Sequence, residues 1–197
     1  SRLRRIKENW IDSKIACSAY GFISVSKACS KSIENRQALK KINKEYIYNG
    51  ISSLSPKIIT NIKKELEVHA DTLILLMLAV YEPRKGHEFI FKVMDKVILK
   101  LPQTHLLICG YGSNDEVQLV EDMRLKSSSS SHIHLQGHRS DVQNLLAQTD
   151  IQVVPSQSYE SFGYTSVEAM SCEVPVIATN VGGLGEVVED GVCGYVV

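Results

Sequence analysis

The chain has 197 residues, 44% of them hydrophobic and 22% charged, which are the proportions of an ordinary globular protein and exclude a disordered or fibrous class. No apolar run approaches the roughly 20 residues that span a bilayer, and no secretory signal follows Ser1 to Arg5. The net charge of zero is unevenly divided, because residues 1–70 hold 14 Lys and Arg against 6 Asp and Glu, whereas residues 71–197 hold 8 against 16. The basic part suits either solvated helix faces or contact with an anionic membrane surface, and both alternatives stay open.

The cysteines and the chain ends bear on the cellular context. The five cysteines form no CxxC pair and have no paired histidines; they are Cys17, Cys29, Cys109, Cys172 and Cys193. This spacing argues against zinc and suits a reducing compartment with thiols as small apolar side chains. The chain lacks an initiator Met and stops inside the strand-like run at 194–197, so we expect a piece of a longer protein. We expect a cytoplasmic location, with peripheral attachment to the inner membrane face left open.

The first part of the chain predicts a short α/β unit. A strand is expected at 21–25, a helix over 26–41 with Ser26 as its N-cap, and a strand at 46–48 that the turn dipeptide Asn49-Gly50 closes. Residues 52–56 have the composition of a linker. Apolar residues at helical spacing then predict a helix over 58–66.

From Thr72 onward, apolar segments alternate with amphipathic ones. Strands are predicted at 73–80, 104–109, 131–136, 150–154, 175–178 and 193–197, and helices near 86–100, 115–126, 140–147, 163–171 and 184–188. This alternation indicates an α/β fold, a Rossmann-like parallel sheet flanked by helices on both faces. Ligands of such sheets bind beyond the carboxyl ends of the strands. The serine run at 127–131 predicts a flexible connection on the side away from the ligand.

The stretch from Glu160 to Met170 reads as a strand end, a short loop and a helix. The first N–H groups of a helix have no intrahelical partner, and the helix dipole favours an anion there, so this helix start suits a phosphate. Glu160 in the loop and Glu168 in the helix flank the start and suit sugar hydroxyls. The open alternative is an ordinary strand-to-helix crossover with solvated glutamates.

Four other loops that follow strands carry residues suited to a ligand. They contain Lys85 at 82–87, Gly110 and Gly112 at 110–113, His138 and Arg139 at 136–139, and Gly182-Gly183 at 180–186. A lysine can neutralise phosphate, glycines let a backbone approach a ligand, and a loop with His or Arg can reach a base or a phosphate. Each loop also has an ordinary interpretation as a surface cation, a tight turn or a helix entry.

Other chemistries lack their parts. The third glycine of a dinucleotide-binding GxGxxG would be Asp115, which disfavours a nicotinamide or flavin site. There is no GxSxG elbow, no GxxxxGK[ST] loop and no Asp-x-Asp pair to hold a divalent ion on a diphosphate. We therefore expect no cofactor, no metal and no nucleic-acid partner.

Taken in order, residues 20–197 resemble the carboxyl-terminal half of glycosyltransferase family 4, retaining nucleotide-sugar transferases of GT-B fold. The matching residues are Phe22 to Ser26, Asn49-Gly50, Lys85-Gly86, Gly110-Tyr111-Gly112, Gly137, Asp141-Val142, Asp150, Pro155-Ser156, Glu160 to Gly163, Glu168 to Met170, Pro175 to Thr179, Gly182-Gly183, Glu186 to Val188 and Gly191 to Gly194. Each match is weak alone, and their order and spacing make the resemblance specific.

The resemblance implies roles for these residues. Lys85 and Glu160 would be catalytic, Lys85 stabilising the leaving-group charge and Glu160 lying near the transferred sugar. Glu168 would bind the ribose of the donor, and the N–H groups around Gly163 would hold its diphosphate. The full implied donor-binding set is Gly110, Gly112, His138, Ser161, Phe162, Gly163, Tyr164, Thr165 and Glu168. The donor would be a nucleoside diphosphate sugar, and the sugar acceptor a glycan, lipid or small molecule.

Two departures and one gap limit this resemblance. The family places an Arg five residues before the Lys, where this chain has Val80, and Ser161 stands where Gly is commoner. By resemblance, residues 1–54 are the end of an amino-terminal, acceptor-side domain and residues 55–197 the nucleotide-sugar-binding domain, truncated at its end. We therefore expect hexosyltransferase-type activity from the full-length protein and not from this piece. The alternatives are a nucleotide-binding module without transfer activity and a GT-B nucleotide-sugar epimerase.

Overall fold

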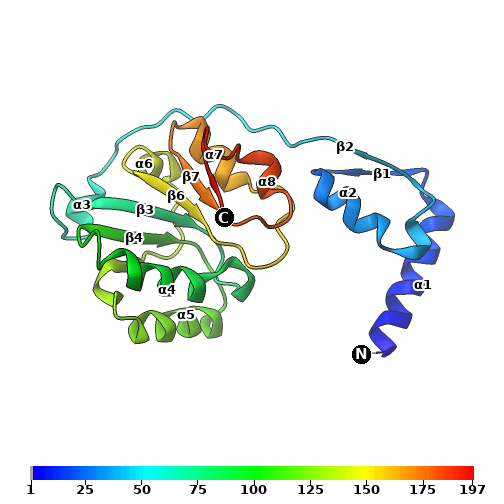
Figure 1. Cartoon of the computed structure of the whole chain (residues 1–197), viewed down its shortest axis with the longest axis horizontal. Coiled ribbons are helices and arrows are strands. Elements are labelled where there is room, and N and C mark those ends of the chain that lie inside the picture. Colours follow the sequence, from blue (N-terminus) through cyan, green and yellow to red (C-terminus); the bar gives the residue numbers. More distant parts are fainter. Residues whose placement is uncertain (1) are drawn as a thin grey trace.

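The computed structural model describes residues 2–197, with side chains from residue 8 onward. Figure 1 shows two parts joined by a long extended segment. The first part contains α1 (Arg2–Ser18), β1 (Gly21–Ser24), α2 (Lys27–Glu34), a 3-10 turn (Gln37–Leu39) and β2 (Asn43–Tyr46), with β1 and β2 parallel. The proposed boundary at residue 54 falls in the extended segment, and the assignment of the first part to an acceptor-side domain stays a prediction.

Two predictions in this part were wrong in extent. The helix predicted over 26–41 begins at its expected cap, Ser26, but ends at Glu34 because Asn35 caps it and the chain then forms a 3-10 turn that buries Leu39. The strand predicted at 46–48 lies at 43–46, because pairing with β1 matches Ser24 to Tyr46. Pairing between strands, which local composition does not encode, decided the second shift.

The helix predicted over 58–66 is only α3 (Ile62–Glu65). The backbone N–H groups of Ile59 and Thr60 donate to the side-chain oxygen of Asn144 at 2.8 and 3.2 Å, which holds these residues outside the helix. Asn61 then caps α3 by accepting the N–H of Lys64 at 3.0 Å. A contact from a distant part of the chain therefore shortened this helix.

The second part is built on six parallel strands in the order β5-β4-β3-β6-β7-β8. These are β3 (Leu73–Leu78), β4 (Thr104–Cys109), β5 (Ile133–Leu135), β6 (Ile151–Val154), β7 (Val176–Ala178) and β8 (Gly194–Val196). The helices between them are α4 (His87–Val97), α5 (Asn114–Lys126), α6 (Val142–Leu146), α7 (Tyr164–Ser171) and α8 (Leu184–Val187). From β3 the chain adds β4 and β5 toward one edge of the sheet, and from β6 it adds β7 and β8 toward the other edge. The boundary between β3 and β6 is therefore the topological switch point, where such sheets form a crevice for ligands. The predicted doubly covered parallel sheet is confirmed.

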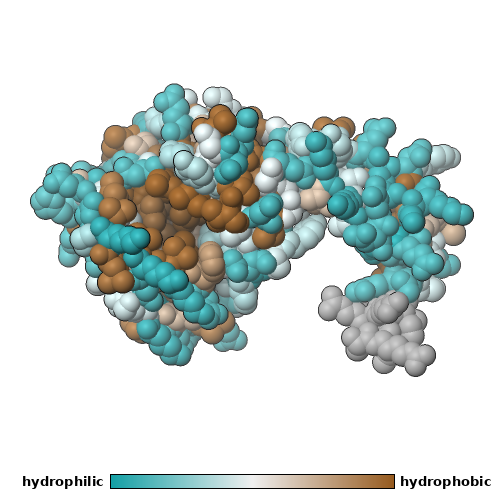
Figure 2. Space-filling view, in the orientation of Figure 1, coloured by the Kyte–Doolittle hydropathy of each residue, from teal (hydrophilic) through white to brown (hydrophobic). Residues whose placement is uncertain are grey.

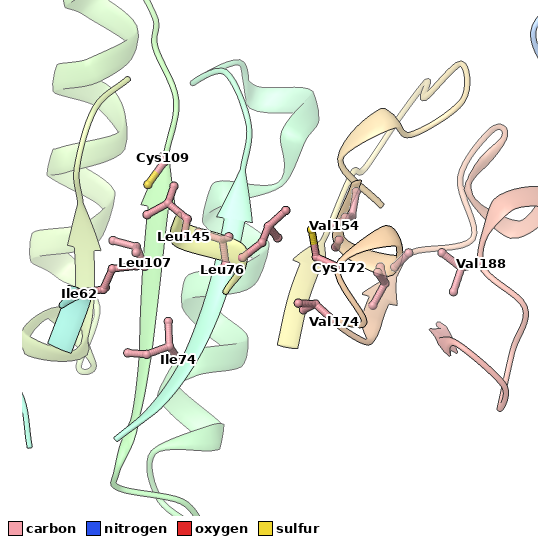
Figure 3. Close-up of a cluster of buried hydrophobic side chains, with 14 of the residues drawn as sticks. Ile62, Ile74, Leu76, Leu107, Cys109, Leu145, Val154, Cys172, Val174 and Val188 are labelled. Carbon is pink, nitrogen blue, oxygen red and sulfur yellow. The ribbon is translucent and has the colours of Figure 1, made fainter. Parts of the chain in front are cut away.

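Both faces of this sheet are buried, as the continuous apolar strands predict. One cluster packs Leu76, Leu107 and Val154 against α6 and α7 (Figure 3). The other packs Ile108 and Met77 against side chains of α4 and α5. Neighbouring residues of one strand, such as Leu107 and Ile108, belong to different clusters because side chains alternate across a strand.

The serine run is ordered, which corrects the prediction of a flexible connection. The hydroxyls of Ser127, Ser128 and Ser129 donate to one oxygen of Asp95 in α4 at 2.7 to 2.8 Å, and the N–H of Ser129 adds a bond of 2.9 Å. The carboxylate therefore anchors the connection between α5 and β5.

Within the described residues, no helix is both long and apolar enough to cross a membrane.

Candidate functional site

The start of α7 presents free N–H groups at the switch point of the sheet. Gly163 precedes the helix with φ +93°, a left-handed conformation that favours glycine, and a side chain there would come within 2.5 Å of Leu184. Gly163 offers no side-chain cap. Among the described residues, no hydrogen bond engages the N–H groups of Gly163, Tyr164 and Thr165. The predicted anion seat is therefore structurally open.

Lys85 and Glu160 form an ion pair beside this helix start. The Lys85 Nζ lies 2.6 Å from Oε2 of Glu160, and their side chains are only 18% and 15% exposed. Lys85 ends a 3-10 turn (Pro83–Lys85) after β3, whereas Glu160 lies in the loop after β6. The Ser156 hydroxyl donates to the same Glu160 oxygen at 3.3 Å. Because β3 and β6 are neighbours, two residues 75 positions apart in the sequence meet at the switch point.

A cavity of about 220 Å³ lies at this pair. Its lining includes Lys85, Ser156, Glu160, Gly163, Tyr164 and Thr165. A second cavity of about 230 Å³ is lined by Val80, Gly110, Tyr111, His138, Arg139, Thr165 and Glu168, among others. Leu78, Ala79 and Thr165 line both, so the two hollows adjoin across the end of β3.

The second cavity combines aromatic rings with a partly buried acid. The rings of Tyr111 and His138 lie edge to face with centroids 6.1 Å apart. Burial raises the pKa of the Glu168 carboxyl above its usual value. Rings at one end and a carboxylate at the other are groups that can contact a base and hydroxyls.

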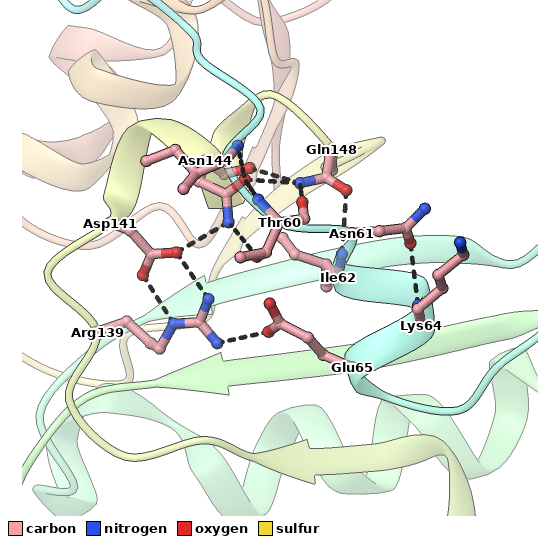
Figure 4. A network of polar contacts seen from close by, with 10 residues as sticks. Thr60, Asn61, Ile62, Lys64, Glu65, Arg139, Asp141, Asn144 and Gln148 are labelled. Atoms are coloured by element: carbon pink, nitrogen blue, oxygen red, sulfur yellow. Dashed lines mark hydrogen bonds and ion pairs between the residues drawn. The ribbon is translucent and has the colours of Figure 1, made fainter.

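Arg139 is already held by two acids, although it lines this cavity. It donates to both oxygens of Asp141 at 2.7 Å and to Glu65 at 2.9 Å, in a network that continues through Asn144 to Thr60 (Figure 4). Hydrogen bonds from Arg139 and Asn144 lower the pKa of Asp141 despite its partial burial. Arg139 therefore holds this network together, and its contact with a phosphate stays a prediction.

Most predicted site residues come together, and some lie outside the two cavities. Gly112 packs against Tyr81 and Glu116 and lines neither cavity. Ser161 and Phe162 also line neither. The Phe162 ring is buried between those of Tyr48 and Tyr164, with centroids 6.3 and 5.4 Å away. Donor binding by these residues and by those in the cavities stays a prediction.

Arg84 directly precedes Lys85 of the ion pair but lines neither cavity. Its guanidinium pairs with Glu82 and donates to the carbonyl of Tyr159 at 3.4 Å. It therefore places no charge in the space beside Val80, which lines the second cavity.

Sequence reasoning gave no role to two residues of the cavities whose side chains carry a hydroxyl. Tyr111 stands between Gly110 and Gly112, and an aromatic residue inside a glycine loop was the available signal. Ser156 is buried, and its signal was the Pro-Ser pair that directly follows β6. Its hydrogen bond to Glu160 depends on the loop conformation, which the sequence does not reveal.

A larger hollow of about 460 Å³ lies elsewhere. It is lined mainly by apolar residues at and near the amino ends of β6, β7 and β8, including Ile151, Val174, Val176 and Val192. Figure 2 shows apolar side chains gathered in a hollow over this part of the molecule. None of the predicted site residues lines it, and strand amino ends are not where parallel sheets bind ligands.

Across the described part of the chain, no group of three or more His, Cys, Asp or Glu could hold a metal ion.

Comparison with known proteins points in one direction. Residues 58–197 match the family model described as glycosyl transferases group 1. The chain is 30% identical over 169 residues to the N-acetyl-alpha-D-glucosaminyl L-malate synthase of Bacillus anthracis, covering 83% of the chain and 43% of that protein.

Solved structures are similar across both parts. The Anabaena protein HepE in complex with UDP and glucose has 27% identity and a TM-score of 0.78, covering 93% of this chain and 50% of that one. The sucrose-phosphate synthase of Thermosynechococcus elongatus has 25% identity and a TM-score of 0.81, covering 97% and 48%. The chain thus spans about half the length of the relatives it matches.

Proposed function

Since this chain belongs to the glycosyl transferases group 1 family, we propose that it is the donor-binding part of a retaining glycosyltransferase. The observation that carries the proposal is the Lys85–Glu160 ion pair, at 2.6 Å, beside the free N–H groups of α7. The adjoining cavity supports it, because Glu168, Tyr111 and His138 line that cavity and suit the ribose and base of a nucleotide.

In this proposal the first cavity binds the diphosphate and the transferred sugar of the donor, and the second cavity binds its ribose and base. The N–H groups of Gly163, Tyr164 and Thr165 would hold the diphosphate at the positive end of α7, and Lys85 would neutralise the charge that grows on the leaving phosphate. Glu160 would face the transferred sugar, where positive charge develops at the anomeric carbon. Glu168 would accept hydrogen bonds from the ribose hydroxyls, with the base near Tyr111 and His138.

We propose a UDP-hexose as the donor. The support is that HepE, at 25 to 27% identity, has been solved with UDP and with UDP-glucose. The sugar acceptor stays open between a glycan, a lipid and a small molecule. The names of two relatives include L-malate and phosphatidyl-myo-inositol, which illustrates that range. We also propose a cytoplasmic location, with attachment to an anionic membrane surface as the open variant.

Calorimetry with UDP tests the binding site on this chain. We expect binding of UDP in preference to GDP, weakened about tenfold in Lys85→Ala because a charge-assisted hydrogen bond is lost. In the full-length protein, Lys85→Ala and Glu160→Ala should each lower transfer about a hundredfold. Lys92→Ala, which removes an exposed lysine of α4, is the control. Transfer rates within threefold of wild type in both site variants would sink these roles.

One observation favours a second candidate, a nucleotide-binding module without transfer activity. Among the described residues that line the two cavities, the only Lys or Arg side chains are Lys85 and Arg139, and both are already paired with acids. Val80 adds no charge. Binding of UDP by the full-length protein without any turnover of donor would favour the module.

A further inference from the structure

Glu186 in α8 binds the amino end of α2, a helix of the other part of the molecule. The N–H of Lys27 donates to its Oε2 at 2.8 Å and the N–H of Ala28 to its Oε1 at 2.7 Å. The Tyr48 hydroxyl, at the start of the extended segment, donates to Oε2 at 3.0 Å. One carboxylate thus receives three hydrogen bonds from residues 138 to 159 positions away.

These bonds complete the N-terminus of α2. Ser26 accepts the N–H of Cys29 with its hydroxyl at 3.1 Å and that of Ser30 with its carbonyl at 3.1 Å. The two remaining first-turn donors belong to Lys27 and Ala28, and Glu186 takes both. A carboxylate is also the group that the positive end of a helix dipole favours.

The same contact reaches the loop that carries Glu160. The Gly183 N–H, just before α8, donates to the Glu160 carbonyl at 2.8 Å. From the α2 side, the Cys29 thiol donates to the Ser161 carbonyl at 3.5 Å. The backbone of this loop is therefore held by α8 and by α2, and Glu186 joins those two helices to each other.

We infer that Glu186 is a positioning residue, which couples the placement of the first part of the molecule to the orientation of Glu160. This inference rests on the proposed function for its catalytic consequence, but the contact itself does not. Glu186 touches neither cavity, so it acts through α8 and the Gly183 bond to Glu160. Its loss should leave UDP binding intact and disturb the step in which Glu160 takes part.

Hydrogen exchange on this chain tests the contact. In Glu186→Ala, the amides of Lys27 and Ala28 should exchange about tenfold faster than in wild type, and that of Gly183 should also speed up. Tyr48→Phe removes one of the three bonds and should have a smaller effect. Glu189→Gln, which neutralises an exposed acid three residues away, is the matched control. Unchanged exchange at Lys27 and Ala28 in Glu186→Ala would overturn the inference.

Kinetics of the full-length protein test the positioning role. Glu186→Ala should lower kcat about tenfold or more while the donor KM and the UDP affinity stay within twofold. Glu186→Gln keeps one acceptor oxygen and should fall between wild type and Glu186→Ala in both measurements. Faster exchange together with unchanged kcat would overturn the role. Failure of wild type to bind UDP would refute the proposed function, and the exchange result would still decide the contact.

Discussion

At the scale of single residues, burial and backbone conformation set what the site can do. Glu168 lies partly buried in the second cavity, and the raised pKa of its carboxyl shows that the charged form is disfavoured there. Ionisation of a carboxyl in such surroundings costs free energy, and carboxyls perturbed in this way gather at functional sites.

Glu168→Gln should therefore raise stability and weaken nucleotide binding. The raised pKa means that the folded protein binds the Glu168 proton more tightly than the unfolded chain does. The contribution of Glu168 to stability therefore becomes less favourable as pH rises past the ordinary glutamate pKa. The variant should melt higher than wild type at neutral pH, as measured by calorimetry, and bind UDP about tenfold more weakly. Glu173→Gln, which neutralises an exposed acid just beyond the C-terminal end of α7, is the control. Equal UDP affinity of variant and wild type would contradict the ribose role.

Gly86 fixes the loop that carries Lys85. Its φ is +83°, and a Cβ would lie 2.0 Å from the carbonyl oxygen of Pro155. Gly86→Ala should lower the free energy of unfolding by about 2 kcal/mol or more, as measured by urea denaturation. Gly50→Ala, where nothing lies within 4 Å, should change it by less than about 0.5 kcal/mol. Similar losses in the two variants would show that the close approach of the loops is unimportant.

At the scale of elements, long-range polar contacts anchor the irregular segments. The buried Asn144 of α6 accepts the N–H groups of Ile59 and Thr60 and donates to Thr60 and Asp141. This explains why the helix predicted over 58–66 begins only at Ile62. The helical spacing of apolar residues was a correct local signal, and the amide of Asn144 outweighed it.

Asn144→Asp should be more damaging than its small change in shape suggests. The variant keeps oxygens for Ile59 and Thr60 but loses the donor to Asp141, and it places a buried carboxylate beside the partly buried one of Asp141. We expect a loss of about 3 kcal/mol or more in the free energy of unfolding at pH 7, smaller at acidic pH where one acid is protonated. Gln143→Glu on the same helix is the control. A loss independent of pH would contradict the carboxylate repulsion.

Asp95 makes the connection between α5 and β5 sensitive to acid. Burial acts to raise the pKa of its carboxyl, but hydrogen bonds from Ser127, Ser128 and Ser129 outweigh it and lower the pKa to about 2. Because the folded-state pKa is lowered, the contribution to stability is present above the ordinary value near 4 and is lost as pH falls through about 2. Asp95→Asn should lose about 2 kcal/mol at pH 7, as measured by urea denaturation. Asp122→Asn on the exposed side of α5 should not, and equal losses would contradict the anchor.

At the scale of the whole molecule, the two parts differ in how much core they contain. The buried members of both apolar clusters belong to the second part, from Ile62 onward, and Leu54 of the extended segment packs against one of them. Of the described side chains before Ile62, Leu39 is the only apolar one counted as buried. Exposed apolar residues of the first part include Trp10, Tyr20 and Ile23. Hydrophobic burial therefore stabilises the six-stranded sheet far more than the pair β1 and β2.

Native-state hydrogen exchange should separate the two parts. Amides of β1 and β2 should exchange with opening free energies at least about 2 kcal/mol below those of β3 and β4, because few apolar contacts oppose their opening. The edge strand β5 serves as the control for exposure within the large sheet. Equal protection in β1 and β4 would show that the chain opens as one unit.

The sequence by itself determined the alternation of strands and helices in the second part, the cap at Ser26 and the loops in which a ligand would bind. These features depend on local patterns of apolar residues and turn residues, which lie within a few positions of one another. Only the tertiary structure decided that Lys85 meets Glu160, that Arg139 is held by Asp141 and Glu65, and that Glu186 binds α2. Lys85 meets Glu160 because β3 and β6 are neighbours in the sheet, and Glu186 reaches α2 because the two parts of the molecule pack together there. A local pattern encodes neither arrangement.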